Sequence, residues 1–192
     1  LMYEAGQARP GAMAAVLGLG TAEVEAACDA ASSGELGVAV AANLNAPDQT
    51  VLSGDPAAVE RAGELCKAAG AKRVMPLKVS GAFHSPLMAP AAQGLTHALA
   101  GVSFGTPRVP VIANATARPV QEATHAVRLL ADQLTAPVRW VESMRTAAEL
   151  APGARFIELG PGTVLAGLLR RIVPDATCVS LGTAADLEKF LA

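Results

Sequence analysis

Between residues 11 and 80, short apolar runs alternate with two helical patterns, and few folds accommodate the order in which they come. One helix is expected from Thr21, a typical N-terminal cap, to about Ala31, and a second begins at Asp55-Pro56 and ends at Gly70. The apolar runs have the length of strands and cover residues 12–17, 38–42, 50–52 and 74–79. The order strand, helix, strand, strand, helix, strand predicts a ferredoxin-like βαββαβ unit.

A turn-rich segment, Asn43-Leu44-Asn45-Ala46-Pro47-Asp48, separates the second and third apolar runs. Asparagine, proline and aspartate favour tight turns, so this segment predicts a hairpin-like reversal of the chain. Turn chemistry is by itself enough to explain the two asparagines.

After residue 81 the pattern changes to longer helices between single buried strands. Strands are expected at residues 109–112, 156–159 and 178–181, and helices at 85–100, on both sides of Pro137, at 162–172 and from Thr183 onward. Such alternation predicts a layered α/β domain with a largely parallel sheet. We therefore expect three parts. They are the end of a truncated helix and a linker (1–10), the ferredoxin-like subdomain (11–80) and an α/β body (81–192).

The composition predicts a soluble, folded chain and argues against several classes of partner. Hydrophobic residues make up 52% of the 192 residues and charged residues 17%, which is ample for a sizeable core. A net charge of -2, a pI near 5.9 and 3% aromatic residues leave no basic surface for nucleic acid or an anionic membrane. No apolar run approaches the roughly 18 residues of a membrane span, and the three cysteines form no CxxC pattern. These observations favour a cytoplasmic protein.

The run Gly81-Ala82-Phe83-His84-Ser85-Pro86 places a histidine where an expected strand gives way to a helix. The positive amides of the helix start disfavour the imidazolium and keep the neutral ring available as a general base. From this context alone a structural histidine is an equally good interpretation. His97 and His125 are interpreted as surface groups of helices, and the spacing of the three histidines suggests no metal site.

Two glycine motifs match the residue pattern of a known functional site but lie in a different secondary-structure or sequence context. Gly101-Val102-Ser103-Phe104-Gly105 matches the G-x-S-x-G nucleophile elbow, which needs a strand before the serine and a helix after it. A helix is expected before Ser103 and two prolines follow, so we interpret it as part of a connection. Gly160-Pro161-Gly162 joins a strand to a helix as a dinucleotide fingerprint does, but Leu165 stands at the third glycine position. A nucleotide-binding domain is the weakest of the hypotheses.

A series of longer motifs stands in a fixed order along the chain. They are Gly11-Ala12-Met13-Ala14-Ala15-Val16-Leu17-Gly18, Asn43-Leu44-Asn45-Ala46-Pro47, Val59-Glu60-Arg61-Ala62, Gly81-Ala82-Phe83-His84-Ser85-Pro86-Leu87-Met88, Gln133-Leu134 with Pro137-Val138-Arg139-Trp140, and Glu158-Leu159-Gly160-Pro161-Gly162. This series resembles the malonyl-CoA:acyl carrier protein transacylase family, in its free-standing bacterial form, over essentially the whole chain. The resemblance implies an α/β-hydrolase-like body with the ferredoxin-like subdomain inserted into it.

The resemblance also implies a ping-pong reaction. A serine takes malonyl from coenzyme A as an ester and passes it to the phosphopantetheine thiol of acyl carrier protein, so a coenzyme A thioester is the substrate and no cofactor is required. His84 matches the family's general base, and Gln133 matches the residue whose backbone carbonyl orients that imidazole. Phe83 matches a position linked to the choice of acyl group, where a bulky ring would crowd an α-methyl branch. A core aromatic is the alternative for Phe83. The candidates for the pantetheine channel are Asn43, Asn45 and Asn114.

One departure from the family decides activity. The family's nucleophile elbow, its malonate-binding arginine and its glutamine-containing oxyanion loop belong to an N-terminal portion, and we expect this chain to begin just after it. Without the serine no acyl-enzyme forms, and without the arginine the malonate carboxylate has no bidentate partner. We expect the chain to be inactive alone and to self-associate through an exposed sheet edge, and the complete enzyme to be a monomer. The alternative is a non-catalytic module that binds acyl carrier protein, or one half of a split transferase.

Overall fold

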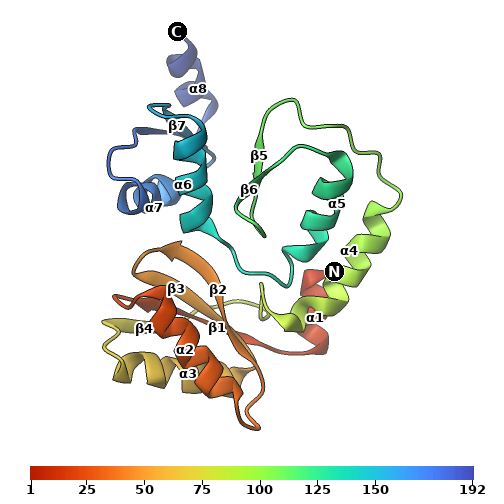
Figure 1. Ribbon diagram of the computed structural model, residues 1–192, viewed down its shortest axis with the longest axis vertical. Helices are drawn as coiled ribbons and strands as arrows, with labels where there is room; N and C mark the ends of the chain where they lie inside the picture. The colour runs from red at the N-terminus through yellow and green to blue at the C-terminus, as the bar shows by residue number, and fades with distance from the viewer.

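The computed structural model describes residues 1–192 as a mixed α/β fold with two regions (Figure 1). We call residues 11–80 the sheet unit and residues 81–192 the C-terminal region; helix α1 (Met2–Ala8) contacts the latter. The elements of the sheet unit are β1 (Ala12–Leu17), α2 (Thr21–Ser32), β2 (Ala39–Ala46), β3 (Gln49–Gly54), α3 (Pro56–Ala68) and β4 (Arg73–Pro76). The order of strands and helices is the predicted one.

The strands of the sheet unit form one antiparallel sheet in the order β2-β3-β1-β4. Helices α2 and α3 pack side by side on one face (Figure 1), where Val16, Leu52 and Cys66 are fully buried in a core of 13 residues. The opposite face is also covered, and it buries Met13 and Val51. Because both faces of the sheet are buried, β1 is apolar at every position and does not alternate.

Strand β2 is longer than predicted. The predicted hairpin reversal is confirmed, because β2 and β3 pair antiparallel, but its predicted extent was wrong: β2 continues through Asn43 and Asn45 to Ala46, and only Pro47-Asp48 forms the turn. Two register shifts against β3 interrupt the pairing along this stretch. Residues with turn propensity are therefore held in a bulged edge strand.

A tertiary contact explains the extension of β2. Leu44 N donates to the Val138 carbonyl (2.8 Å), and Val138 N donates to the Ala42 carbonyl (2.7 Å), so the free edge of β2 gains a hydrogen-bonding partner. Strand β4 shows the opposite deviation, ending at Pro76 where the pattern predicted Val79. One further backbone hydrogen bond, from Leu77 N to the Met13 carbonyl (2.9 Å), continues the contact with β1 before the chain leaves the sheet.

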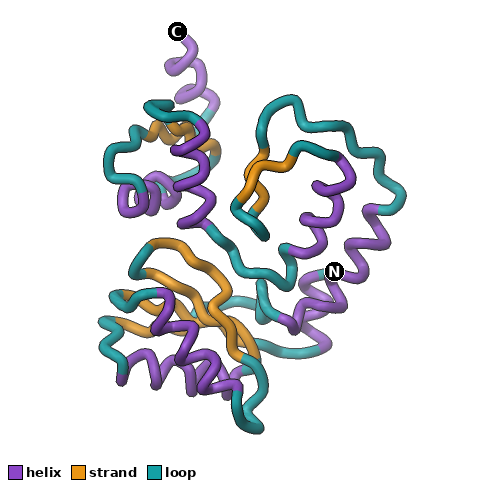
Figure 2. The backbone as a smooth tube through the Cα atoms, viewed as in Figure 1, coloured by secondary structure: helices purple, strands orange, loops and turns teal.

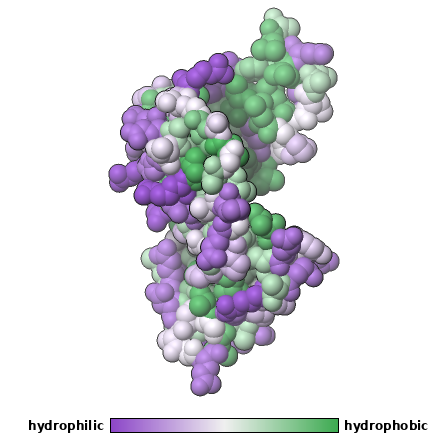
Figure 3. Space-filling model, turned by 90° about the vertical axis from the view of Figure 1, so that its right-hand side faces the viewer, coloured by the Kyte–Doolittle hydropathy of each residue, from purple (hydrophilic) through white to green (hydrophobic).

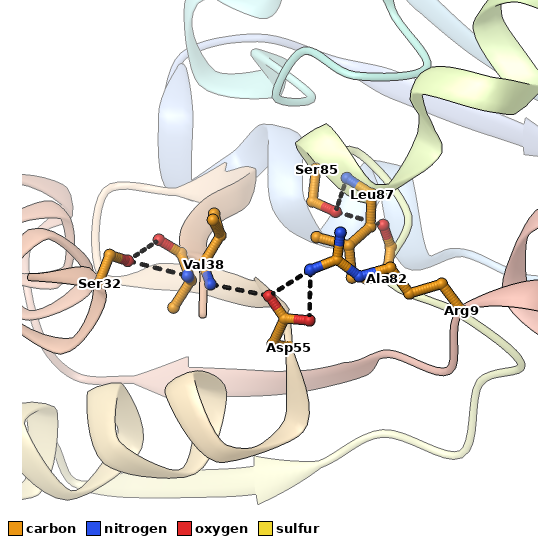
Figure 4. Close-up of polar contacts among 8 residues, drawn as sticks. Arg9, Ser32, Val38, Asp55, Ala82, Ser85 and Leu87 are labelled. Carbon is orange, nitrogen blue, oxygen red and sulfur yellow. Dashed lines mark hydrogen bonds and ion pairs between the residues drawn. The ribbon is translucent and has the colours of Figure 1, made fainter. Parts of the chain in front are cut away.

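Two predicted helix caps use their side chains differently. Gly20, and not Thr21, is the N-cap of α2, and the Thr21 hydroxyl lies 3.5 Å from that of Thr50. Asp55 does hold the N-cap position of α3, but its carboxylate accepts from the Val38 amide at 2.8 Å and does not cap the helix (Figure 4). In both cases a tertiary partner takes the side chain that the sequence assigned to the helix end.

The C-terminal region departs furthest from the prediction. Its elements are η1 (Pro86–Met88), α4 (Ala89–Leu99), β5 (Val111–Ala113), β6 (Arg118–Val120), α5 (Ala123–Asp132), α6 (Trp140–Leu150), β7 (Phe156–Leu159), α7 (Val164–Ile172), β8 (Cys178–Leu181) and α8 (Ala184–Leu191). Strands β7 and β8 were predicted at these residues and pair in parallel. The predicted largely parallel sheet was wrong, because β5 and β6 form a separate antiparallel pair. The left-handed residue Ala117 (φ 54°) reverses the chain there, where the pattern predicted a single strand.

Two sets of hydrogen bonds join the regions. The loop of residues 133–139, teal in Figure 2, runs between α5 and α6 and reaches the edge of β2. On the other side, Arg171 of α7 donates to Gln49 Oε1 at 2.6 Å and pairs with Asp48, both beside the β2–β3 turn. None of the helices has the length and apolar character that crossing a membrane would take.

Exposed apolar residues concentrate in the C-terminal region. In Figure 3 hydrophobic residues gather along the right-hand side of its upper part, beside a mostly hydrophilic left-hand side. Leu159 of β7, Val164 of α7 and Leu191 of α8 are 75%, 71% and 74% exposed. By contrast, every side chain of β1 is buried or half-buried.

Candidate active site

His84 lies in the turn that leads from the sheet unit into η1. Its backbone is left-handed (φ 57°), a conformation that residues other than glycine rarely adopt. The ring Nδ1 lies 3.0 Å from the backbone carbonyl oxygen of Gln133, the residue that follows α5. Because a carbonyl only accepts, the neutral ring carries its proton on Nδ1 and keeps the lone pair on Nε2. This geometry suits a group that takes up a proton at Nε2.

No hydroxyl group of the chain hydrogen-bonds to His84. Ser85 is fully buried, and its Oγ donates to the Ala82 carbonyl (2.7 Å) and accepts from the Leu87 amide (3.3 Å) (Figure 4). Ser103 is exposed in the irregular segment between α4 and β5, so its interpretation as a connection is confirmed. His84 therefore has the geometry of a base without a nucleophile among these residues.

Phe83 packs against two hydrophobic clusters at once. One cluster contains Met88 and Leu134 of the C-terminal region, and the other contains Val51 on the face of the sheet opposite α2 and α3. Phe83, which precedes His84 in the chain, is half-buried, and its contacts with both clusters place it at the joint between the two regions. This position is compatible with both predicted roles, a core aromatic and a neighbour of the acyl group.

Two of the three candidate asparagines hold the loop of residues 133–139. Asn43 forms an isolated parallel bridge with Val138, and Asn114 Nδ2 donates to the Pro137 carbonyl at 3.2 Å. The same loop begins with the carbonyl that holds His84. Sequence reasoning missed this arrangement, because no local pattern shows which segments meet across the joint.

A hollow of about 340 Å³ opens beside this loop. Asn114 and Gln133 line it together with mainly apolar residues of β5, β6 and α5. Asn45 lies away from this hollow on β2, and its side chain makes no hydrogen bond. The structure thus brings Asn114 and Gln133 together and leaves Asn45 apart from them.

The carboxylate of Glu158 occupies the N-terminus of α7. It accepts from the amides of Leu165 (2.9 Å) and Ala166 (3.1 Å) and from the hydroxyl of Ser180 (2.8 Å). Partial desolvation raises the pKa of Glu158, but these three donors outweigh it and hold the pKa below its usual value. Since the Glu158 carboxylate already binds two amides at the start of α7, this helix end is poorly suited to hold a phosphate, which argues against the nucleotide-binding hypothesis at Gly160-Pro161-Gly162.

The remaining shifted groups are structural. Partial burial raises the pKa of Asp55, but the Val38 amide and the Arg9 guanidinium outweigh it and lower the pKa below its usual value. Burial raises the pKa of Cys28 to about 12, which keeps the thiol protonated and unreactive. No group of three or more histidine, cysteine, aspartate or glutamate side chains is placed to hold a metal ion.

The sequence matches the acyl transferase domain over residues 2–189. The chain belongs to the acyl transferase domain family. It is 42% identical over its full length to the malonyl CoA-acyl carrier protein transacylase of Haemophilus influenzae and 43% identical over 99% of its length to that of Escherichia coli K12. The predicted resemblance is confirmed. These alignments cover 61% and 60% of the two relatives, so the chain spans about 60% of the length of the curated relatives it matches.

Solved structures of transacylases are similar throughout this acyl transferase chain. An acyl carrier protein S-malonyltransferase of Vibrio cholerae matches with a TM-score of 0.92 and 40% identity, covering 98% of this chain and 61% of the other. A complex of a type II polyketide synthase acyl carrier protein with its malonyl-transacylase matches with a TM-score of 0.88 and 39% identity, covering 96% and 60%. The arrangement of the two regions is therefore shared with proteins of this family.

Proposed function

We propose that this chain carries the general base of a malonyl-CoA:acyl carrier protein transacylase of fatty acid synthesis. Such an enzyme moves malonyl from coenzyme A to the phosphopantetheine thiol of acyl carrier protein in the cytoplasm, with a coenzyme A thioester as substrate and no cofactor. The observation that carries the proposal is the 3.0 Å contact of His84 Nδ1 with the Gln133 carbonyl, in a chain of the acyl transferase family. That contact leaves Nε2 as the proton acceptor.

His84 acts twice in the proposed reaction. In the first half, Nε2 takes the proton of a serine hydroxyl as the serine oxygen attacks the thioester carbonyl, and it gives that proton to the coenzyme A sulfur when the C–S bond breaks. In the second half, Nε2 takes the proton of the phosphopantetheine thiol as its sulfur attacks the serine ester, and it returns the proton to the serine oxygen. The Gln133 carbonyl keeps Nδ1–H bonded throughout and so stabilises the imidazolium.

The serine of this reaction comes from outside the 192 residues. Ser85 is engaged in the turn, Ser103 lies in an irregular exposed segment, and the relatives are longer than this chain. We therefore expect the chain alone to form no covalent adduct with malonyl-CoA. Intact-mass measurement after incubation checks this, and a mass increase equal to one malonyl group would contradict it.

A chimera tests the role of His84. The chain replaces the segment that it matches in the Escherichia coli transacylase, and transfer of malonyl to acyl carrier protein is measured. We expect the chimera to be active and His84→Ala to lower kcat by about 10²- to 10⁴-fold, the usual contribution of a general base. His97→Ala, on the exposed side of α4, is the control and leaves the rate unchanged. An H84A chimera with full activity would exclude His84 as the base.

A second candidate function is that of a non-catalytic module that binds acyl carrier protein, or one half of a split transferase. The observation that favours it is that no hydroxyl of this chain reaches His84, while a neighbour of similar fold is in complex with an acyl carrier protein. If the chain is a module, it binds holo acyl carrier protein by itself, and His84→Ala leaves the dissociation constant unchanged. Titration calorimetry with the isolated chain distinguishes the two cases.

Phe83 is proposed to favour malonyl over methylmalonyl. Phe83 directly precedes the proposed base in the chain, and a bulky ring at this position would crowd an α-methyl branch. Phe83→Ser in the chimera should raise the rate with methylmalonyl-CoA relative to the rate with malonyl-CoA. An unchanged ratio of the two rates would contradict this role of Phe83. Asn43 and Asn45 have side chains without hydrogen-bond partners and remain candidates for pantetheine contact, whereas the amide of Asn114 is engaged with Pro137.

The resemblance to the transacylases also leads to a proposal for the fold and the oligomeric state. The strand order β2-β3-β1-β4 with two helices on one face supports a ferredoxin-like subdomain, inserted into an α/β-hydrolase-like body to which the C-terminal region contributes. The complete enzyme is proposed to be a monomer, and the isolated chain to self-associate through exposed apolar residues such as Leu159 and Leu191. Size-exclusion chromatography of the isolated chain as a clean monomer would count against self-association.

A further inference from the structure

The turn that carries His84 has a strained backbone. A left-handed residue other than glycine persists only where its surroundings hold it, and such residues cluster at functional sites. His84 has a φ of 57°, and the nearby residues Ala82, Ser85 and Met88 of the same segment are fully buried. Something in this turn must therefore hold His84 against relaxation to an ordinary backbone conformation.

The side chain of Ser85 supplies that restraint. Its Oγ donates to the Ala82 carbonyl at 2.7 Å and accepts from the Leu87 amide at 3.3 Å, and its own carbonyl accepts from Met88 N at 3.0 Å. Figure 4 shows the Ser85 hydroxyl between the backbone groups of Ala82 and Leu87, one before and one after His84. Ser85 is 0% exposed, so water has no access to replace these bonds.

The direction of the imidazole depends on this turn. Nδ1 reaches the Gln133 carbonyl across 49 residues of sequence, and the ring gets there from a left-handed backbone. A return of His84 to an ordinary φ would redirect its Cα–Cβ bond and take the ring away from Gln133. We propose that Ser85 is a positioning residue for His84, whose hydroxyl keeps Nδ1 on the Gln133 carbonyl and the lone pair on Nε2; this inference rests on the proposed role of His84 as the base.

A matched control lies elsewhere in the core. Ser53 of β3 is also 0% exposed, but its Oγ has no hydrogen-bond partner. Removing the Ser53 hydroxyl therefore repeats the loss of a buried oxygen without breaking a bond. A difference between variants at the two serines reports the hydrogen bonds of Ser85 and not its burial.

Nuclear magnetic resonance of the ¹⁵N-labelled chain tests the inference without any assay of activity. Long-range ¹H–¹⁵N spectra of the imidazole distinguish the Nδ1–H from the Nε2–H tautomer. We expect the Nδ1–H form of His84 to dominate in the wild type and in Ser53→Ala, and its ratio to the Nε2–H form to fall about five- to tenfold in Ser85→Ala. If Ser85→Ala does not fold, the same tautomer ratio is measured in Ser85→Cys, which nearly preserves the side-chain volume but has a weaker hydrogen-bond donor. An unchanged tautomer ratio in the folded variant overturns the proposal.

Kinetics of the chimera give the second readout. We expect Ser85→Ala to lower kcat by about 10- to 100-fold, as a misplaced catalytic group does, with KM for malonyl-CoA unchanged. Ser85→Thr, which retains the hydroxyl, should recover most of that loss, and Ser53→Ala should change neither constant. If His84→Ala leaves the chimera fully active, the proposed function fails, and the tautomer measurement still decides the role of Ser85.

Discussion

The two regions of this chain bury their apolar side chains to different extents. The sheet unit closes four strands and two helices around a 13-residue core, whereas the C-terminal region holds two separate strand pairs and leaves Leu159 of β7 75% exposed. The stability of the isolated chain should therefore reside mainly in the sheet unit. His84 belongs to neither core; it lies at the joint, and its ring is held by a carbonyl of the C-terminal region.

The largest expected effect comes from the core of the sheet unit. Leu52→Ala removes a side chain that is 0% exposed under α2 and α3, and we expect it to lower the free energy of unfolding by about 3–4 kcal/mol. The matched change Leu159→Ala, in the exposed strand β7, should cost no more than about 0.5 kcal/mol. Urea denaturation followed by circular dichroism measures both. Equal losses at the two leucines would mean that the regions do not differ as the structure indicates.

The next effect concerns the joint. Phe83→Ala removes a half-buried ring that packs on clusters of both regions, and we expect a loss of about 2 kcal/mol, below the 3–5 kcal/mol of a fully buried phenylalanine. Amide hydrogen exchange should then speed up around Met88 and Val51 together. Phe104→Ala, in the irregular segment after α4, is the control. Faster exchange in only one region would show that Phe83 belongs to that core alone.

Sequence reasoning succeeded where local signals and packing agree. Strands β1, β7 and β8 lie at their predicted residues, and Thr183 caps α8 with Asp186 in a capping box. Sequence reasoning failed where contacts with a segment distant in the sequence, or an unusual backbone conformation, determine the local structure. The extension of β2 depends on its backbone hydrogen bonds with Val138. The hairpin of β5 and β6 depends on a left-handed backbone at Ala117, which could not be predicted because alanine rarely adopts that conformation.

The candidate site divides in the same way. Position along the chain and family resemblance pointed to His84 and Gln133, and the structure places them in contact. The support of the base by Ser85 and the anchoring of the 133–139 loop by Asn114 depend on distances that no motif encodes. The catalytic roles of His84 and Gln133 are predictions that the chimera tests.

A smaller effect is expected where the linker meets the sheet unit. Arg9 Nη2 donates to both carboxylate oxygens of Asp55 at 2.8 and 3.0 Å, and the Val38 amide donates to the same group. Asp55→Asn should therefore cost about 1–2 kcal/mol at neutral pH. Because the pKa of Asp55 is lowered in the folded state, this contribution is complete above the unfolded value near 4 and is lost as the pH falls through the folded pKa.

Unfolding free energies of the wild type and D55N at pH 7 and pH 3 check this dependence. The difference between the two proteins should shrink at the lower pH. Asp29→Asn, an exposed carboxylate of α2 without a hydrogen bond, is the control and should change stability by less than about 0.5 kcal/mol at either pH. A D55N deficit that stays constant or grows in acid would contradict the assignment.

The smallest effect is expected at the second contact between the regions. Arg171 of α7 pairs with Asp48 and donates to Gln49, and the Arg171 hydrogen bond lowers the pKa of the Asp48 carboxyl. Both charged side chains are 40% or more exposed, so Arg171→Gln should cost less than about 1 kcal/mol, and 1 M salt should remove most of the difference. Arg170→Gln, the adjacent exposed arginine without an ion pair, is the control. A loss of several kcal/mol in R171Q that persists in salt would mean that this contact, and not the packing around Phe83, holds the two regions together.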